Sequence, residues 1–280
     1  MTVEDISFKK SEDASKYLSK IERTDSNGDF CDELADNSDE IFEIVCCGEV
    51  VGLAYIDDDE KESFIYVHIF PEHRRKGIGK LAALAAEREL KKSPKSILTG
   101  FGADEELAKK LAAELGYKKK FASAKMVYRG GKFGETAPVR NYRDEDFDAA
   151  FALTAEAFHI MRLGTGCFPD SELAKPREDS RKNWLEDAEN EYVYELDGEV
   201  VGFAETEDDL LDCVAIRTDR QGEGLGRAFV KYMVDRIIES GHNEVCLWCV
   251  VGNDKARRLY ESLGFEEVSR AEYAVKKPGE

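Results

Sequence analysis

The sequence predicts an α/β fold that is built twice within one chain. Three landmarks recur in the same order in both halves, and each half contains strands, a glycine loop and helices. The landmarks are residues 47–54 and 197–204, residues 74–79 and 221–226, and residues 115–117 and 263–265, at offsets of 150, 147 and 148. Such agreement is hard to obtain by chance, so we interpret the chain as a tandem duplication.

A glycine-rich segment separates the two halves. Residues 130–138 read Gly-Gly-Lys-Phe-Gly-Glu-Thr-Ala-Pro, a composition typical of a linker. We therefore expect an N-terminal domain over residues 1–130, a linker over residues 131–138 and a C-terminal domain over residues 139–280. At 280 residues the chain is long enough for two domains that each bury a core.

The second half shows the order of elements most clearly. A helical stretch includes residues 147–153, and a hairpin follows over residues 192–204 with its turn at Asp197-Gly198. The next strand, residues 210–216, runs directly into the glycine loop. This order places the loop late in the domain, whereas a dinucleotide-binding fold has it after the first strand. Nicotinamide or flavin chemistry is therefore disfavoured.

The elements after the loop complete the unit. Apolar residues at helical spacing predict a helix over residues 229–238, with Gly241 as its C-terminal cap. A strand around Cys246 and a short helix over residues 254–263, ended by Gly264, follow. Strand, glycine loop, helix, strand and helix together make an α/β unit.

The composition limits the classes of function. A formal net charge of −19 argues against nucleic acid, whose phosphates would be repelled. An acidic surface attracts cations, although such a charge can also serve solubility alone. No apolar run approaches the roughly 20 residues that span a bilayer, and the acidic first five residues do not form a secretory signal. We expect a cytoplasmic protein without membrane contact.

The seven cysteines form no regular framework, which favours reduced thiols. Cys246 and Cys249 have the spacing of a metal or redox pair, but they lie in a predicted strand. Side chains three residues apart on a strand point to opposite faces, so these two sulfurs cannot easily share a ligand. The four histidines are scattered, and we expect no metal site.

The loop over residues 221–227 has the properties of a phosphate-binding turn. Glycines allow a close backbone approach, and the start of the following helix offers unpaired N–H groups and a positive dipole end. Arg227 adds a positive charge just inside that helix. A strand-to-helix glycine loop alone also marks ordinary tight turns. Its repetition in the first half, with Arg74, Arg75, Lys76 and Lys80 around it, favours a ligand loop.

The motif then resembles a known family. The segment from Val214 through Gln221-x-x-Gly224-x-Gly226 is similar to the acyl-CoA pyrophosphate loop of the GNAT superfamily, and residues 253–265 resemble its second CoA-contacting segment. Both segments lie within residues 214–265 of the second half. The resemblance implies two tandem GNAT domains of the mycothiol-synthase-like type. Each would have a mixed, mostly antiparallel sheet flanked by helices, an α/β (α+β layered) fold.

The resemblance also implies which residues bind acetyl-CoA, as co-substrate and with no metal. The strand before the loop would bulge and part from its neighbour, so that Val214 and Ile216 present backbone groups to pantetheine and to the acyl oxygen. Asn253 would contact the cofactor near the parted strands. The pyrophosphate would be held by Gln221, Gly222, Gly224, Leu225, Gly226 and Arg227.

Two catalytic roles follow from the resemblance. Tyr260 would protonate the departing thiolate, a step worth about 10²–10⁴-fold. The alternative is a core aromatic, because Tyr260 lies on an apolar helical stripe. The general base would be a carboxylate on or before the strand that leads to the loop. We nominate Asp212, which shares strand parity with Val214, over Glu207, Asp208 and Asp209; the alternative is a solvated acidic turn.

The first half retains only part of this pattern. Arg74, Gly77 and Gly79 of its loop could still hold CoA phosphates, but Glu105 stands in place of Asn253 and Ala112 in place of Tyr260. We expect the N-terminal domain to be a non-catalytic partner. The connection after the first helix of the second half, around residues 158–184, is the expected acceptor region.

The leading hypothesis is an N-acetyltransferase that moves an acetyl group from acetyl-CoA to a primary amine by direct attack through a tetrahedral intermediate. The acceptor would be a small-molecule or peptide amine, with a cationic one favoured, and the protein a monomer or homodimer. The alternatives are a non-catalytic CoA-binding or sensing tandem module and an interaction protein on an inactive scaffold.

Overall fold

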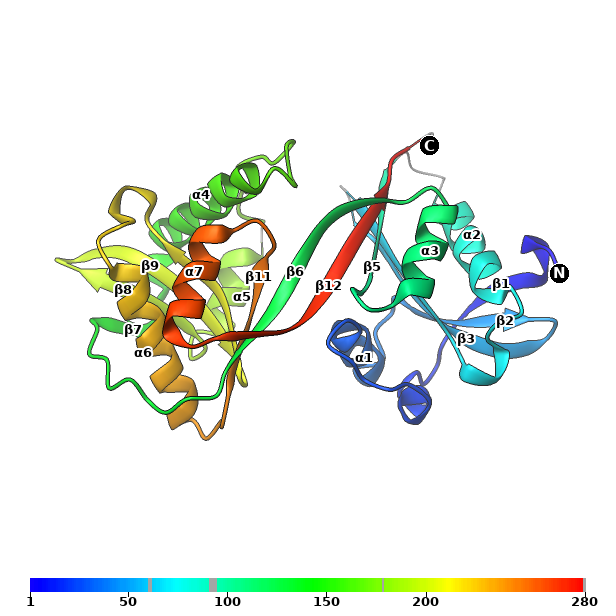
Figure 1. The fold of residues 1–280 in the computed structure, drawn as a ribbon, viewed down its shortest axis with the longest axis horizontal. Helices are drawn as coiled ribbons and strands as arrows, with labels where there is room; N and C mark the ends of the chain where they lie inside the picture. The colour runs from blue at the N-terminus through cyan, green and yellow to red at the C-terminus, as the bar shows by residue number, and fades with distance from the viewer. Residues whose placement is uncertain (60–61, 91–94, 178, 279–280) are drawn as a thin grey trace. The chain divides into compact units, whose positions relative to one another are not determined.

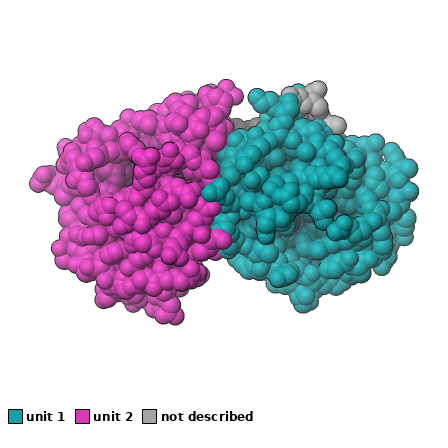
Figure 2. Space-filling view, in the orientation of Figure 1, with its two compact units in different colours: residues 1–122, 269–280 teal, residues 123–268 magenta. Residues whose placement is uncertain are grey.

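The computed structural model describes residues 1–59, 62–90, 95–177 and 179–278. The chain forms two compact units, which Figure 2 shows in separate colours. Unit 1 contains Met1–Ala122 and Ser269–Glu280, and unit 2 contains Ser123–Val268. This division differs from the contiguous domains expected over residues 1–130 and 139–280. The C-terminal residues belong to the first unit, and residues 123–130 belong to the second.

Unit 1 has helices on a mixed sheet. Its strands lie in the order β1-β2-β3-β4-β5-β12, with every neighbouring pair antiparallel except the parallel pair β4–β5. The elements are β1 (Ile6–Lys10), α1 (Gly28–Ala35), β2 (Ile41–Cys46), β3 (Glu49–Asp58), β4 (Glu62–Ile69), α2 (Ile78–Leu90), β5 (Ser96–Gly102), α3 (Glu106–Glu114) and most of β12 (Glu266–Lys276).

Unit 2 repeats this architecture. Its strand order is β7-β8-β9-β10-β11-β6, and the parallel pair is β10–β11. The elements are the second part of β6 (Lys118–Tyr128), β7 (Val139–Asn141), α4 (Phe147–Thr165), α5 (Ser180–Glu186), β8 (Glu191–Leu196), β9 (Glu199–Glu207), β10 (Leu210–Ile216), α6 (Leu225–Glu239), β11 (Val245–Val250) and α7 (Asp254–Leu263). The mixed, mostly antiparallel sheets confirm the fold class.

The last strand of each half completes the sheet of the other unit. β6 follows α3 in the chain, yet residues 123–128 pair with β11 of unit 2. β12 follows α7, yet residues 271–276 pair with β5 of unit 1. Both strands cross the division between the units, which falls after Ala122 in β6 and after Val268 in β12 (Figure 1). This exchange is why neither unit is a continuous segment.

Strand alternation separates two apolar cores on the faces of the unit 2 sheet. Tyr194 and Ala204 pack with Phe229 and Met233 of α6, together with α7. On the other face, Val193 and Phe203 pack beneath α4 and α5, and the Trp184 ring stacks on Phe203 at 4.4 Å. Adjacent residues of a strand point to opposite faces, so one hydrophobic strand serves both layers. The site described below lies between these layers.

The glycine-rich linker is fastened to unit 2. Asp235 of α6, 6% exposed, accepts hydrogen bonds from the backbone N–H groups of Phe133 (2.5 Å) and Glu135 (2.8 Å). The Phe133 ring stacks on Tyr128 at 5.1 Å. Because its backbone donors are satisfied by a buried carboxylate, this segment is part of the second fold rather than a free tether. Of the helices that the structure describes, none has the length and apolarity to cross a membrane.

Candidate active site

A bulge interrupts β10 directly before the glycine loop. The register with β9 shifts between Asp212 and Ala215, and Cys213 has a positive φ of 51°. On its other side, β10 pairs with β11 through Leu210–Cys246 alone. The two parallel strands therefore part after Leu210. A bulge next to parted strands re-aims backbone groups that would otherwise be used in the sheet.

Unit 1 provides an internal comparison. There β4 pairs with β3 without a register shift, and with β5 through three consecutive residue pairs that begin at Glu62–Ser96. Glycines 52 and 202 occupy equivalent positions, opposite Ile69 and Ile216. Counting back from Ile69 and Ile216 to the next pair of equivalent positions takes three residues in β4 and four in β10. The second unit thus contains one extra residue at the bulge.

The glycine loop leads into the N-terminus of α6. Gly222 and Gly224 have φ values of 89° and 87°, a region that L side chains rarely adopt. The first turn of α6 begins directly afterwards, and its N–H groups have no intrahelical acceptor. Gln221 donates from Nε2 to the carbonyl oxygen of Ile216 at 3.1 Å, which holds the loop to the end of β10. Arg227 is exposed and donates to Ser262 of α7 at 2.6 Å.

A cavity of about 820 Å³ opens between β10, β11 and the starts of α6 and α7. This volume is large enough for a cofactor-sized ligand. The predicted residues that line it are Asp212, Val214, Ile216, Gln221, Gly222, Gly224, Gly226, Arg227, Asn253 and Tyr260. Leu225 is not among the lining residues and packs against the core beneath α6. Arg74, Gly77 and Gly79 belong to the loop of unit 1.

Tyr260 lies at the inner wall of the cavity. The side chain is 8% exposed, and its ring packs against Phe265 at 5.7 Å. Burial, and then the nearby Cys249 and Asp212, raise the pKa of the phenol well above its usual range. The phenol therefore keeps its proton at neutral pH and remains a donor. Asn253 caps α7, where its side chain accepts from the N–H of Ala256 at 3.4 Å.

The loop of unit 1 is arranged differently. Arg74, equivalent to Gln221, donates from Nε to the carbonyl oxygen of Ile69 at 2.7 Å and lies 3.4 Å from the His68 ring nitrogen. Burial, and then the Arg74 charge, lower the pKa of His68 to about 4. Ala112 occupies the place of Tyr260, and Glu105 stands before its helix with nearly the backbone angles of Asn253 but without the capping hydrogen bond. The helix is thus retained without the phenol.

Residues of α4 within the expected acceptor region contribute one wall of the cavity. Phe158, Met161, Gly164 and Thr165 of α4 line it. The helix continues through Thr165, and Gly166, with a φ of 69°, ends it. Trp184 is instead part of the core beneath α4.

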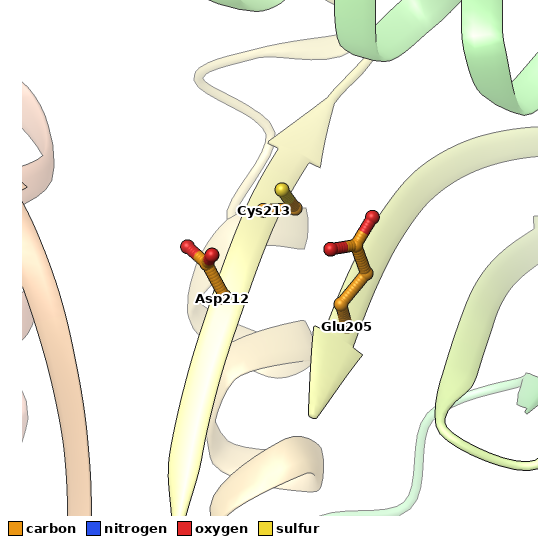
Figure 3. Close-up of side chains that lie close together, drawn as sticks. All are labelled: Glu205, Asp212 and Cys213. Carbon is orange, nitrogen blue, oxygen red and sulfur yellow. The ribbon is translucent and has the colours of Figure 1, made fainter. Parts of the chain in front are cut away.

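Sequence reasoning missed a group of acidic side chains beside the bulge. Glu205 on β9 lies directly opposite Asp212, and the Cys213 thiol lies with them. A carboxylate oxygen of each acid and the cysteine sulfur all lie within 4.8 Å of one another (Figure 3). Burial and the Asp212 charge raise the pKa of Glu205, although a hydrogen bond from the Cys213 thiol opposes them. Glu207 ends β9, and Asp208 and Asp209 form the turn before β10. In the sequence, the only indication of this group is Glu205 itself, which directly follows the repeated residues 197–204.

The two cysteines of residues 246–249 lie on opposite faces of β11, as predicted. Cys249 lines the cavity and belongs to the core beneath α6, whereas Cys246 does neither. Burial raises the pKa of the Cys249 thiol to about 11. A thiol in this state is a poor nucleophile and a poor metal ligand at neutral pH.

Comparison with known proteins agrees with the duplicated architecture. The sequence model of the acetyltransferase (GNAT) family matches residues 8–117 and again residues 157–265. The mycothiol acetyltransferase of Corynebacterium efficiens is 26% identical over 242 residues, which cover 80% of this chain and 76% of that protein.

Solved structures share the fold over the whole chain. A GCN5-related N-acetyltransferase from Sphaerobacter thermophilus has a TM-score of 0.74 at 16% identity, with 99% of this chain and 97% of that one covered. A tandem GNAT protein from the clavulanic acid biosynthesis pathway has a TM-score of 0.66 at 13% identity, with 98% and 99% covered. At such identities the likeness shows the fold alone.

Proposed function

Starting from the fact that this chain belongs to the acetyltransferase (GNAT) family and is an acyl-CoA-dependent N-acyltransferase, we propose that unit 2 acetylates a primary amine. The acetyl group would pass from acetyl-CoA to a small-molecule or peptide amine by direct attack. The observation that carries this proposal is the bulged end of β10, parted from β11 and followed at once by the glycine loop and α6.

The loop and the helix terminus suit the pyrophosphate of acetyl-CoA. Gly222 and Gly224 keep side chains away from the N-terminus of α6, where free N–H groups and the helix dipole favour an anion. Arg227 and Lys255, at the starts of α6 and α7, supply positive charge on the cavity wall. Backbone groups of Val214 and Ile216, on the edge that β11 leaves free, would pair with pantetheine.

Backbone donors at the bulge would also stabilise the reaction. When an amine attacks the thioester, negative charge develops on the acyl oxygen. N–H groups fixed near that oxygen stabilise the charge more in the transition state than in the ground state. The strand supplies such groups because β10 is not paired with β11 beyond Leu210.

Tyr260 would act as the general acid. Its buried phenol lines the same cavity as Val214 and keeps its proton at neutral pH. The phenol could then donate to the departing thiolate, which is a tolerable leaving group because thiol pKa values are near 8.5. General acid catalysis of this kind contributes about 10²–10⁴-fold.

We also propose that unit 1 is a non-catalytic partner. Its strand β4 pairs without a register shift, Ala112 replaces the phenol, and Arg74 is hydrogen-bonded to Ile69 and His68 beside the loop. Its basic loop could still bind phosphates.

Two matched glycine variants test which loop binds acetyl-CoA. Gly224 and Gly77 are equivalent, have positive φ values of 87° and 79°, and would each place a Cβ in open space. Alanine at either position therefore carries the same backbone strain, roughly 1–2 kcal/mol. We expect Gly224→Ala to weaken acetyl-CoA binding about 5- to 30-fold, as measured by calorimetry. The acetyl-CoA affinity of Gly77→Ala should stay close to that of the parent.

A thiol-release assay with a panel of primary amines completes the test. Binding of acetyl-CoA without thiol release for any amine would favour the non-catalytic sensing module. A loss of affinity in Gly77→Ala but not in Gly224→Ala would overturn the assignment of unit 2.

A further inference from the structure

Three carboxylates form a row across neighbouring strands of unit 2. Glu191 on β8 pairs with Glu205 on β9, and Glu205 pairs with Asp212 on β10. Side chains of directly paired residues lie on the same face of a sheet, so the three groups are neighbours. Like charges at such positions destabilise a sheet, which makes the row costly unless it has a purpose.

The same three positions in unit 1 show that the fold does not need this row. Ile41 pairs with Tyr55, and Tyr55 pairs with Tyr66. Ile41 is 1% exposed, and all three pack in an apolar cluster with Phe30, whose ring lies 4.7 Å from Tyr66. Two copies of one fold thus carry apolar side chains in one unit and carboxylates in the other, beside the bulge.

The row has no positive partner in the part of the chain that the structure describes. None of the three carboxylates takes part in an ion pair there, and Glu191 is 4% exposed with its Oε2 atom unbonded. An unpartnered buried carboxylate next to two others is a site that a cation or a proton would stabilise. Asp212 and Cys213 bring the row to the cavity wall.

The charges of the cavity are separated along β10. Arg227 lies in the first turn of α6, beyond the end of the strand, and Lys255 and Asp254 lie at the start of α7. Asp212 is four residues before Ile216, roughly 13 Å along a strand. Apolar side chains of α4, Phe158, Ile160 and Met161, line the cavity as well. The cationic end suits phosphates, and the acidic end suits a positively charged group on an apolar body.

We propose that Asp212 and Glu205 form the acceptor subsite, in which Asp212, nominated above as the general base, instead binds the amine as an ammonium ion, and Glu205 removes its proton before attack. The acceptor is then an aliphatic amine that is protonated at neutral pH and carried on an apolar body. This inference rests on the proposed acetyl transfer in unit 2.

Glu205, Tyr260 and solvent together account for every proton in this reaction. The ammonium loses one proton to the Glu205 carboxylate, and the free nitrogen lone pair forms the C–N bond. The C–S bond then breaks, and the thiolate takes a proton from Tyr260. The nitrogen loses its second proton, which restores the Tyr260 phenol through solvent, while Glu205 releases its proton to solvent. One proton is released for each amide formed.

The groups around Glu205 suit it to this task. Glu191 faces it from β8, and Asp212 and Cys213 face it from β10; Asp187, in the turn before β8, adds a further negative charge. Burial, and then the Asp212 and Asp187 charges, raise the pKa of Glu205 above its usual range, against a hydrogen bond from the Cys213 thiol, and so toward the value at which a base is effective near neutral pH.

A metal ion is the competing occupant of the same three atoms. Burial, and then Asp212 and Glu205, raise the pKa of the Cys213 thiol far above its usual range, so the sulfur stays protonated. A protonated thiol is a poor ligand, and two carboxylates alone leave a divalent ion under-coordinated. The arrangement therefore favours an ammonium ion over a metal.

The test compares two amines on isosteric variants. The parent, Glu205→Gln, Asp212→Asn and the control Glu207→Gln, an exposed residue at the end of β9, are assayed by thiol release at pH 7. One acceptor is an aliphatic amine with an apolar body, and the other is aniline, which arrives unprotonated. Acetyl-CoA affinity is measured by calorimetry for each variant, as a check on folding.

We expect Glu205→Gln to lose about 100-fold in kcat/KM with the aliphatic amine, and to recover as the pH approaches the amine's own pKa. Asp212→Asn should raise the KM for the aliphatic amine about fivefold. With aniline, both variants should stay within about threefold of the parent, and Glu207→Gln should match it throughout.

Equal losses on both amines, or no loss in Glu205→Gln, would overturn the subsite. So would activity that a chelator abolishes and a divalent metal restores. A parent that binds acetyl-CoA but releases no thiol with either amine would refute the proposed function itself, which is a distinct result.

Discussion

The C-terminal strand carries a buried ion pair whose loss should unfold unit 1 selectively. Lys276 of β12 places its Nζ atom 2.7 Å from Oε2 of Glu87 on α2, and the two side chains are 11% and 1% exposed. Among the described residues, the second carboxylate oxygen of Glu87 has no hydrogen-bond partner, and the neighbouring donor, the Tyr117 phenol, carries no positive charge. We predict that Lys276→Met leaves a buried carboxylate without a positive partner.

The expected cost follows from the burial of both partners. Removal of one member of a buried pair destabilises a protein by about 3–5 kcal/mol, because the remaining charge stays out of water. Methionine retains most of the aliphatic stem that the lysine extends over Tyr117. Replacing both members by apolar residues, as in Lys276→Met with Glu87→Met, should return the stability to within about 1 kcal/mol of the parent or better.

Hydrogen exchange as a function of urea measures this effect locally. Exchange at the buried amides of α2 follows unit 1, whereas both tryptophans, Trp184 and Trp248, lie in unit 2 and report on it by fluorescence. The control is Lys277→Met, which changes the exposed neighbouring lysine. A cost below about 1 kcal/mol in Lys276→Met, or a double variant no better than the single one, would refute the reasoning.

Three further predictions concern unit 2. Tyr260→Phe should lower kcat about 100-fold and leave acetyl-CoA affinity unchanged, whereas Tyr232→Phe on α6 should be silent; thiol release and calorimetry measure both. Burial, and then Glu205, raise the pKa of Glu191 to about 9, so the folded state holds a proton that the unfolded chain loses above about 4.5. Stability should therefore fall as pH rises from about 4.5 to 9, and Glu191→Gln should be more stable than the parent at pH 7, by up to about 3 kcal/mol in urea melts, and no more stable below pH 4. Deletion of Cys213 should remove the bulge and abolish transfer while circular dichroism stays native, and a fully active deletion variant would exclude the bulge from the reaction.

Local signals in the sequence were enough for most elements of the second half. The strand at residues 210–216 and the helix at residues 254–263 have the predicted bounds, because each is closed by a turn or a glycine. Asp197 and Gly198, with φ values of 52° and 79°, form the expected hairpin turn. Such features depend on neighbouring residues alone, so a single sequence reveals them.

The exchange of β6 and β12 could not be predicted in the same way. Each strand has the alternation of a sheet member, but the partner strand is chosen by contacts more than 100 residues away in the case of β6. The duplication itself makes the choice ambiguous, because either half offers a similar sheet edge. Burial of Ala271 and Ala274 of β12 within unit 1 is visible only in three dimensions.

The acidic subsite was hidden for a related reason. Asp212 was found because it lies on the strand that leads to the loop, whereas Glu205 precedes it by seven residues and becomes its neighbour only through strand register. A shift of one residue would have turned Glu205 to the opposite face. Register therefore decides which of the many acidic residues in this chain can act together.

A single inserted residue distinguishes the two units at the place where carboxylates in unit 2 replace the apolar cluster of unit 1. In unit 1 the strand that leads to the loop stays paired, its neighbours are Tyr55 and Tyr66, and the matching helix position is Ala112. In unit 2 the extra residue breaks the register between Asp212 and Ala215, and Glu205 and Tyr260 accompany it. The apolar version is the one that a stable sheet prefers. The carboxylates, the phenol and the bulge thus occur together in the same copy, as the proposed acetylation of an amine in unit 2 requires.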